Sequence, residues 1–173
     1  PPAPVGRHGV PARQRDRFRR RHATGERGAA ARPVNRSEAT INFRDLGLEP
    51  ALVDAMDELG FDAPTAIQAQ AIPVLLGADG DAVGLAETGS GKTAAFGLPL
   101  LQRIHADMAR PQGVVVCPTR ELCRQITADL KEFAAKRRAL RIIALYGGAS
   151  ITGQIRLLRR GPQVIVATPG RLR

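Results

Sequence analysis

Lys92 and Thr93 close a glycine-rich segment, residues 86–93, that reads A-E-T-G-S-G-K-T. Its residue types suit phosphate binding, because Gly89 and Gly91 let the backbone turn successive N–H groups toward one anion. A helix that begins at Lys92 would add the favourable end of its dipole. The Lys92 ammonium would then reach the terminal phosphates of a nucleotide, and the Thr93 hydroxyl would hold Mg²⁺. The alternative is a structural turn with a lysine at a helix start.

A ring and an amide upstream of this segment suit the binding of a base. Residues 60–68 read G-F-D-A-P-T-A-I-Q, and Phe43 lies seventeen positions before Gly60. The ring of Phe61 can stack on a base, and the Gln68 amide offers the donor and acceptor that match the edge of adenine. Taken alone, Gln68 would more often be a solvated helix residue. Its place ahead of a phosphate-binding loop favours a role in reading adenine.

Three polar turns each follow a short apolar run. Residues 118–122 read P-T-R-E-L, residues 147–148 are both glycine, and residues 168–171 read T-P-G-R. If the apolar runs are parallel strands, the turns share the edge at which open α/β sheets bind ligands. Arg120 and Arg171 would neutralise phosphates there, with hydroxyl and backbone N–H groups as further donors. Such groups contact a nucleic-acid backbone, so binding independent of base sequence is expected.

Alternating strands and helices must position these turns. Apolar runs predict strands at 82–86, 114–117, 142–145 and 164–167, and helical periodicity predicts helices from Pro50 to Gly60, after residues 64–65, and at 92–108, 120–136 and 150–160. Strands this apolar, alternating with helices, indicate an α/β fold with a parallel sheet covered by helices on both faces. The glycine-rich segment then lies between a strand and a helix, which is the context of a phosphate-binding loop.

Composition bounds the class of protein. The 173 residues contain no apolar stretch of the roughly 18 residues that a membrane-spanning helix needs. The only two cysteines, Cys117 and Cys123, are too few for a zinc site and too far apart for a redox C-x-x-C pair. We expect both to be small buried residues in a reducing, cytoplasmic compartment.

The formal charge of +10 is unevenly distributed. Residues 1–40 hold ten Arg against three acidic residues, a local +7, and are rich in Pro, Gly and Ala. Such a segment buries too little apolar surface to offset chain entropy, so a disordered basic tail is expected, followed by one domain over residues 41–173. The tail either holds RNA loosely through its arginines, or is an inert linker, or is an organelle transit peptide.

In this order and spacing, the motifs resemble those of DEAD-box RNA helicases. The loop with Ala86, where the general pattern has Gly, resembles the A-x-T-G-x-G-K-T form of superfamily 2; residues 60–68 resemble the Q motif; P-T-R-E-L and T-P-G-R resemble motifs Ia and Ib. The resemblance runs from about Phe43 to Arg171 and implies a partial RecA-like ATP-binding domain. Cys123 departs from the alanine that the family more often has after P-T-R-E-L.

The resemblance also implies roles for individual residues. ATP, with Mg²⁺ on Thr93, is expected at Phe43, Phe61, Thr65, Gln68, Ala86, Thr88, Gly89, Ser90, Gly91, Lys92 and Thr93, of which Lys92 and Thr93 are the catalytic candidates. RNA is expected at Pro118, Thr119, Arg120, Gly147, Gly148, Thr168, Gly170 and Arg171. The implied activity is ATP-driven unwinding of short RNA duplexes, without a membrane partner.

No D-E-A-D or S-A-T sequence occurs in the chain. In the family, the first supplies carboxylates for hydrolysis and lies on a strand beside that of the phosphate loop. We therefore expect residues 1–173 alone to be inactive and marginally stable. Two other functions remain open: a non-motor RNA clamp or annealing chaperone, and an unrelated phosphate-loop enzyme such as a small-molecule kinase. The Q motif argues against the kinase.

Overall fold

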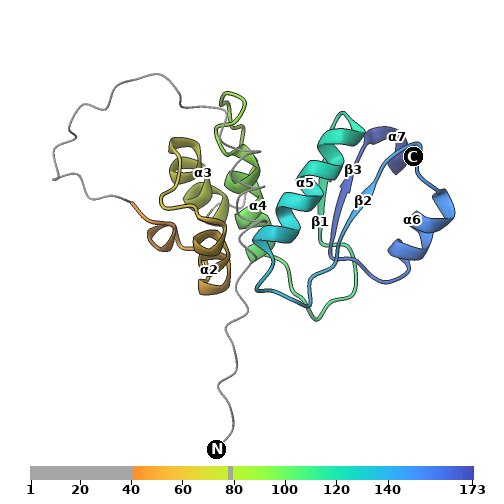
Figure 1. Cartoon of the computed structure of the whole chain (residues 1–173), viewed down its shortest axis with the longest axis horizontal. Coiled ribbons are helices and arrows are strands. Elements are labelled where there is room, and N and C mark those ends of the chain that lie inside the picture. The colour runs from red at the N-terminus through yellow and green to blue at the C-terminus, as the bar shows by residue number, and fades with distance from the viewer. Residues whose placement is uncertain (1–40, 78–79) are drawn as a thin grey trace, which may run out of the picture.

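Three parallel strands form a sheet in the C-terminal part of the chain in the computed structural model, which describes residues 41–77 and 80–173 (Figure 1). The strands are β1 (Gly113–Val116), β2 (Ile142–Leu145) and β3 (Val164–Ala167), in the spatial order β1–β3–β2. Gly113 and Ile142 both align with Val164, so the strands start and end in step. The predicted tail at 1–40 lies outside the described residues.

Helices precede and connect the strands. They are the 3₁₀ helix η1 (Phe43–Leu46), α2 (Pro50–Leu59), α3 (Ala66–Gly77), α4 (Lys92–Gln102), α5 (Arg120–Phe133), α6 (Ile151–Leu158) and α7 (Pro169–Leu172). Helix α2 has the predicted limits, with Pro50 in its first turn and Gly60 as its left-handed C-cap. Among the described residues, no helix combines the length and apolar character needed to cross a membrane.

The predicted helix at 92–108 is wrong beyond residue 102. The chain leaves the helix at Arg103 and forms a loop before β1. Gln112 holds this loop, since its side chain accepts from the His105 N–H at 2.9 Å and donates to the carbonyls of His105 and Met108. Helices α5 and α6 are likewise two to three residues shorter at their C-terminal ends than periodicity predicts.

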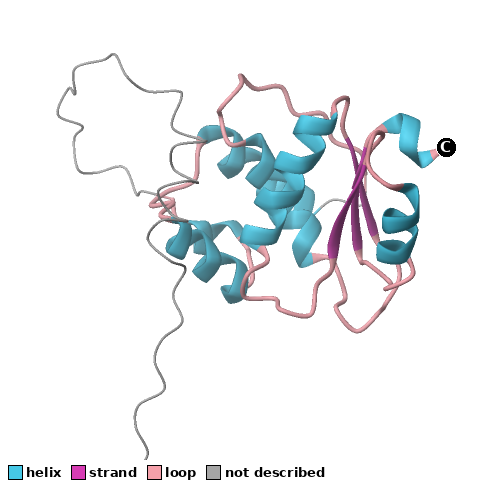
Figure 2. Cartoon of the chain, turned by 45° about the vertical axis from the view of Figure 1, so that its right-hand side comes forward, coloured by secondary structure: helices cyan, strands magenta, loops and turns pink. Residues whose placement is uncertain are grey.

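The sheet carries helices on both faces, as predicted, but unequally. Helix α5 packs against β2 and β3 on one face, and α6 lies on the other (Figure 2). The α5 face belongs to the main core, whereas Ile143, Leu145, Ile165 and Ala167 form a small separate cluster on the α6 face. Next to that cluster, Val114 and Val116 of β1 remain 54% and 58% exposed. The α6 face is therefore only partly covered.

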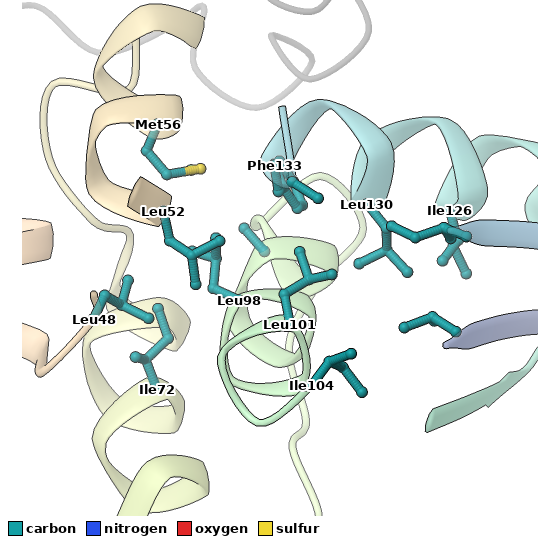
Figure 3. Packing of buried hydrophobic residues seen from close by; sticks show 14 of the residues in the cluster. Leu48, Leu52, Met56, Ile72, Leu98, Leu101, Ile104, Ile126, Leu130 and Phe133 are labelled. Carbon is teal, nitrogen blue, oxygen red and sulfur yellow. The ribbon is translucent and has the colours of Figure 1, made fainter. Parts of the chain in front are cut away.

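Helix α4 joins the sheet to the N-terminal helices. Figure 3 shows Leu98 and Leu101 of α4 between two groups of apolar side chains. Leu52 of α2 and Ile72 of α3 lie on one side, and Leu130 of α5 lies on the other. All five are fully buried. The glycine-rich turn that begins α4 is thus anchored to a helix held on two sides by the core.

The predicted strand at 82–86 is not formed. Residues 81–87 have no regular secondary structure, and the side chains of Val83 and Leu85 are 89% and 90% exposed. A strand is stable only when it pairs with a neighbour, and β1 pairs with β3 alone. The apolar run has strand character without a strand partner among the described residues. The other three predicted strands are confirmed.

Candidate nucleotide and RNA sites

The glycine-rich turn before α4 uses backbone conformations that favour glycine. Gly89 and Gly91 have φ of +81° and +88°, and Gly91 is the N-cap of the helix. Lys92 follows as the first helical residue, and its Nζ donates to the carbonyls of Ala86, at 2.6 Å, and Glu87. The ammonium thus lies inside the turn and contacts two of its carbonyl oxygens. Thr93, the next residue, is half-buried in the first turn of α4.

Gln68 is completely buried and binds the glycine-rich turn directly. Its Oε1 accepts from the Thr65 N–H at 2.9 Å, and its Nε2 donates to the Gly91 carbonyl at 3.1 Å. The Thr65 hydroxyl donates to the Ser90 carbonyl at 2.8 Å. The contact has no spare room, because a Cβ on Gly91 would lie 2.3 Å from the Gln68 Nε2. The sequence motif at 60–68 and the turn are therefore one packed unit, and Gln68 is not a solvated residue.

The two predicted aromatic residues also meet. The rings of Phe43 and Phe61 lie edge to face, with centroids 6.5 Å apart and an interplanar angle of 85°. Phe43 is buried, while Phe61 is only partly buried against the core. An edge-to-face contact of this kind fixes the orientation of the more exposed ring. Phe61 is thus held in place and retains surface on which a base can stack.

The three polar turns converge on one cavity of about 480 Å³ at the carboxyl ends of the strands. It is lined by Pro118, Thr119, Arg120, Glu121, Gly147, Thr168 and Gly170. All but Glu121 were predicted from the sequence. A carboxylate in this candidate site was not expected, and the place of Glu121 within P-T-R-E-L was the only sequence signal for it.

Arg120 lies against the glycine turn after β2. A Cβ on Gly148 would be 2.3 Å from the Arg120 Nη1, and Gly148 has a φ of +85°. The φ favours glycine at this position, and any larger residue would have to displace the Arg120 guanidinium. Thr119 is the N-cap of α5, its hydroxyl accepting from the Leu122 N–H at 3.2 Å. The guanidinium is therefore placed by a capped helix and by a turn that leaves room for it.

Two further side chains hold the same turn. Arg171 Nη2 donates to the Ala149 carbonyl at 3.3 Å, and Gln154 of α6 donates from Nε2 to the Tyr146 carbonyl at 2.9 Å. Gln154 is buried, and its position in a short helix gave no sequence signal for this role. The Thr168 N–H donates to the Leu145 carbonyl at 3.0 Å, so this backbone donor is already engaged within the chain.

Cys117 and Cys123 flank P-T-R-E-L as buried free thiols. Their sulfur atoms lie at neighbouring carbonyls of β3, with Cys123 Sγ 3.2 Å from the oxygen of Val166 and Cys117 Sγ 3.5 Å from that of Ala167. Burial and, second, the adjacent Cys117 raise the pKa of the Cys123 thiol to about 11. Among the described residues, no group of three or more His, Cys, Asp or Glu is placed to hold a metal ion. The Cys123 thiol is thus protonated at neutral pH, and both thiols are buried structural groups.

Residues 65–173 match the family model for DEAD/DEAH box helicases. The chain belongs to this family. The match begins at Thr65 and contains the glycine-rich turn and all three polar turns. The three polar turns are those that line the cavity at the carboxyl ends of the strands. Phe43 and Phe61 precede the matched part.

Named relatives agree with the family assignment. The chain is 46% identical over 136 residues to the ATP-dependent RNA helicase DeaD of Escherichia coli K12, covering 79% of this chain and 22% of that protein. It is 44% identical over 133 residues to the DEAD-box ATP-dependent RNA helicase CshA of Bacillus subtilis, covering 77% of this chain and 26% of that protein. The chain thus spans about a quarter or less of the length of these relatives.

Solved DEAD-box structures share the fold. A DEAD box protein from Methanococcus jannaschii superposes with a TM-score of 0.71 at 35% identity, covering 76% of this chain and 35% of that one. Saccharomyces cerevisiae Dbp5 bound to RNA and ADP BeF3 gives a TM-score of 0.68 at 32% identity, covering 78% of this chain and 33% of that one. The predicted fold class, a partial RecA-like α/β domain, is confirmed.

Proposed function

We propose that this DEAD-box chain is the ATP-binding and RNA-binding part of an ATP-dependent RNA helicase. The contact between Gln68 and Gly91 carries the proposal, because it joins a candidate adenine reader to the turn that would hold the phosphates. Two parts of one nucleotide would then be bound by side chains fixed to each other. A general phosphate-binding turn has no need of such a link.

ATP would be held at its two ends, the base and the phosphates, by different residues of this chain. Phe61, held edge to face by Phe43, offers a stacking surface for the base, and Gln68 lies within the same packed unit. At the other end, Lys92 would exchange the carbonyls of Ala86 and Glu87 for phosphate oxygens. This exchange couples phosphate binding to opening of the turn, since the lysine ties the turn together until the anion arrives.

Mg²⁺ fits the site only together with the nucleotide. Thr93 supplies one hydroxyl in the first turn of α4, and no described carboxylate cluster stands beside it. That donor set suits Mg²⁺, which commonly keeps several waters and is bound by few protein groups plus substrate phosphates. When bound, the ion would neutralise charge that develops on the transferred phosphoryl group.

RNA would bind across the carboxyl ends of the strands. The cavity there is lined by residues 118–121, by Gly147, and by Thr168 and Gly170 of the T-P-G-R turn. Its groups suit phosphate and ribose rather than base edges, so binding independent of sequence follows. Dbp5, a relative of known structure, is described as bound to RNA. We place the protein in the cytoplasm, because its two buried free thiols suit a reducing compartment.

We further propose that residues 1–173 alone do not turn over ATP. Hydrolysis requires carboxylates to position Mg²⁺ and water, and cationic groups for the transition state. Beside Lys92 and Thr93, the described residues offer only the exposed Glu87 in the turn itself. The unpaired segment 81–87 and the half-exposed Val114 and Val116 also leave the sheet incomplete beside β1. Marginal stability of the isolated piece follows.

The test is RNA-stimulated phosphate release, measured for residues 1–173 and for the full-length protein, each beside its Lys92→Ala variant. The full-length protein should release phosphate in a manner that depends on RNA and on Lys92, and residues 1–173 should not exceed their control. Turnover by residues 1–173 would mean that another residue supplies the carboxylate. No turnover by the full-length protein would instead leave the non-motor RNA clamp.

A further inference from the structure

The charge of the chain changes sign at residue 132. Residues 41–132 hold seven Lys and Arg against thirteen Asp and Glu. Residues 133–173 hold nine Lys and Arg and no acidic residue at all. The last third of the described chain is therefore strongly basic, independently of the tail. Only part of this charge belongs to the site at the carboxyl ends of the strands.

Five exposed arginines lie elsewhere, and we call them the amino-edge surface: Arg138, Arg141, Arg156, Arg159 and Arg160. Arg141 directly precedes β2, and its Nη1 donates to the carbonyl of Arg160, which follows α6. These contacts place the surface at the amino ends of β2 and β3, opposite the cavity formed by P-T-R-E-L and T-P-G-R.

None of the five arginines forms an ion pair with a described residue. By contrast, Arg44 pairs with Asp54 and Asp57, and Lys136 pairs with Glu58. Like charges that are close together and unpaired repel one another, and a bound polyanion relieves that repulsion. The surface also consists of arginine alone, whose planar guanidinium matches phosphate oxygens in a bidentate fashion.

Helix α6 connects this surface to the cavity. Its N-cap, Ser150, stands two residues after Gly148, and Arg159 is its C-cap. Eight helical residues span about 12 Å. Arg156 lies exposed in the last turn of the same helix. A nucleic-acid strand that leaves the cavity past the glycine turn and follows α6 would thus meet cationic groups at the C-terminal end of the helix.

We propose that the amino-edge surface is a second RNA contact, which binds phosphates of RNA that flanks the segment held at the carboxyl ends of the strands. The inference rests on the proposed function, since it assumes RNA in the cavity. An anionic membrane is the competing partner, because Ile151, Ile155 and Leu158 are exposed on α6. RNA is favoured because one eight-residue helix, α6, separates these arginines from the candidate RNA cavity of the same domain.

The test compares two double variants of the full-length protein. Arg156→Gln with Arg159→Gln removes two charges from the amino-edge surface without touching the Arg141–Arg160 contact. Arg44→Gln with Lys131→Gln removes the same charge from exposed positions elsewhere. The probes are oligouridylates of about six and about twenty nucleotides. The shorter one cannot extend far beyond the cavity. Affinity is measured over a salt titration.

The amino-edge variant should bind the long RNA about three- to tenfold more weakly, with a salt slope shallower by about 1, because each lost phosphate contact removes about 0.7. The short RNA should bind almost unchanged, and the control variant should keep its affinity for both lengths. An equal loss for both lengths, or an equal loss in the control, would overturn the proposal. So would unchanged RNA binding combined with lost binding to phosphatidylserine vesicles.

The proposed function fails by a different readout, the absence of RNA-stimulated phosphate release from the unaltered protein. A length-dependent loss of RNA affinity without such phosphate release would support the second RNA contact, but in a protein that acts as a non-motor RNA clamp. RNA-stimulated phosphate release without a length-dependent loss of RNA affinity would overturn the second RNA contact but support the proposed helicase function.

Discussion

The Gln68 Nε2 donates a hydrogen bond to the Gly91 carbonyl at 3.1 Å, across 23 positions of sequence. Gly91 is the N-cap of α4, and the helix begins with Lys92. The Gln68 amide of α3 thereby fixes Gly91, the residue at which the phosphate-binding turn leads into α4. Since Gln68 is fully buried, loss of its side chain leaves a polar carbonyl without its partner in the core.

Gln68→Ala should weaken ATP binding by about 1–3 kcal/mol and remove the preference for ATP over GTP in the full-length protein. The bonds to Thr65 and Gly91 leave the Gln68 amide one N–H and one lone pair for adenine, and the alanine variant loses both. Competition of ATP and GTP for a labelled nucleotide measures both effects. Thr65→Val is the matched control, because it removes only the hydroxyl that binds the Ser90 carbonyl. It should weaken both nucleotides alike. Retained discrimination in Gln68→Ala would exclude Gln68 from the base site.

Gly148→Ala should lower RNA affinity by at least about fivefold, equivalent to about 1 kcal/mol. The added Cβ would lie 2.3 Å from the Arg120 Nη1, and the φ of +85° disfavours alanine. Gly153→Ala is the control, since its Cβ would meet Ser150 at an ordinary 3.7 Å. Titration with a labelled oligouridylate compares the two. If both variants bind RNA like the wild type, the glycine turn does not hold the strand.

Cys123→Ala should reduce the loss of stability at alkaline pH. The pKa of Cys123 is raised from 9.0 to about 11 in the folded chain, so the unfolded chain releases the thiol proton first as pH rises. Stability from this group is complete below pH 9 and declines between pH 9 and about 11. Urea unfolding at about pH 8 and about pH 10 measures the decline. A decline of the same size in both proteins would contradict the assignment.

Deletion of residues 1–40 should weaken RNA binding at low salt and make the salt dependence shallower, because ten arginines no longer displace counterions. ATP affinity should stay nearly constant. A variant of the same length with these arginines changed to glutamine separates charge from length. Identical RNA binding by all three proteins across the titration would leave the segment as a linker.

Local sequence patterns located most of the fold but not the pairing of one strand. Helix α2 follows from Pro50, Gly60 and the apolar spacing between them, and all of these are local. The run at 82–86 has the same apolar character as β3, but strand formation also requires a partner. Val83 and Leu85 stay exposed because no described strand lies beside them. A pattern within a segment contains no information about its neighbour in space.

The sites show the same division. Motif order predicted that the turn residues would meet, and six of the seven residues that line the cavity were named in advance. Gln154 was not, because its function depends on facing the Tyr146 carbonyl, which helix geometry decides. The burial of Gln68 was also unexpected from its residue type. Both amides donate to backbone carbonyls. A carbonyl acceptor is present in every residue, so such contacts cannot be recognised in a sequence motif.

The change of charge sign at residue 132 has a kinetic consequence. A net-negative first part and a strongly positive second part give residues 41–173 an electric dipole moment, although their total charge is small. In the field of a polyanion, a dipolar body rotates before it collides. A variant that lacks residues 1–40 should therefore approach RNA with β2, β3 and α6 leading and with α2 and its acidic residues trailing. Most encounters would then begin in a productive orientation, and added salt would reduce the association rate before it reduced the lifetime of the complex.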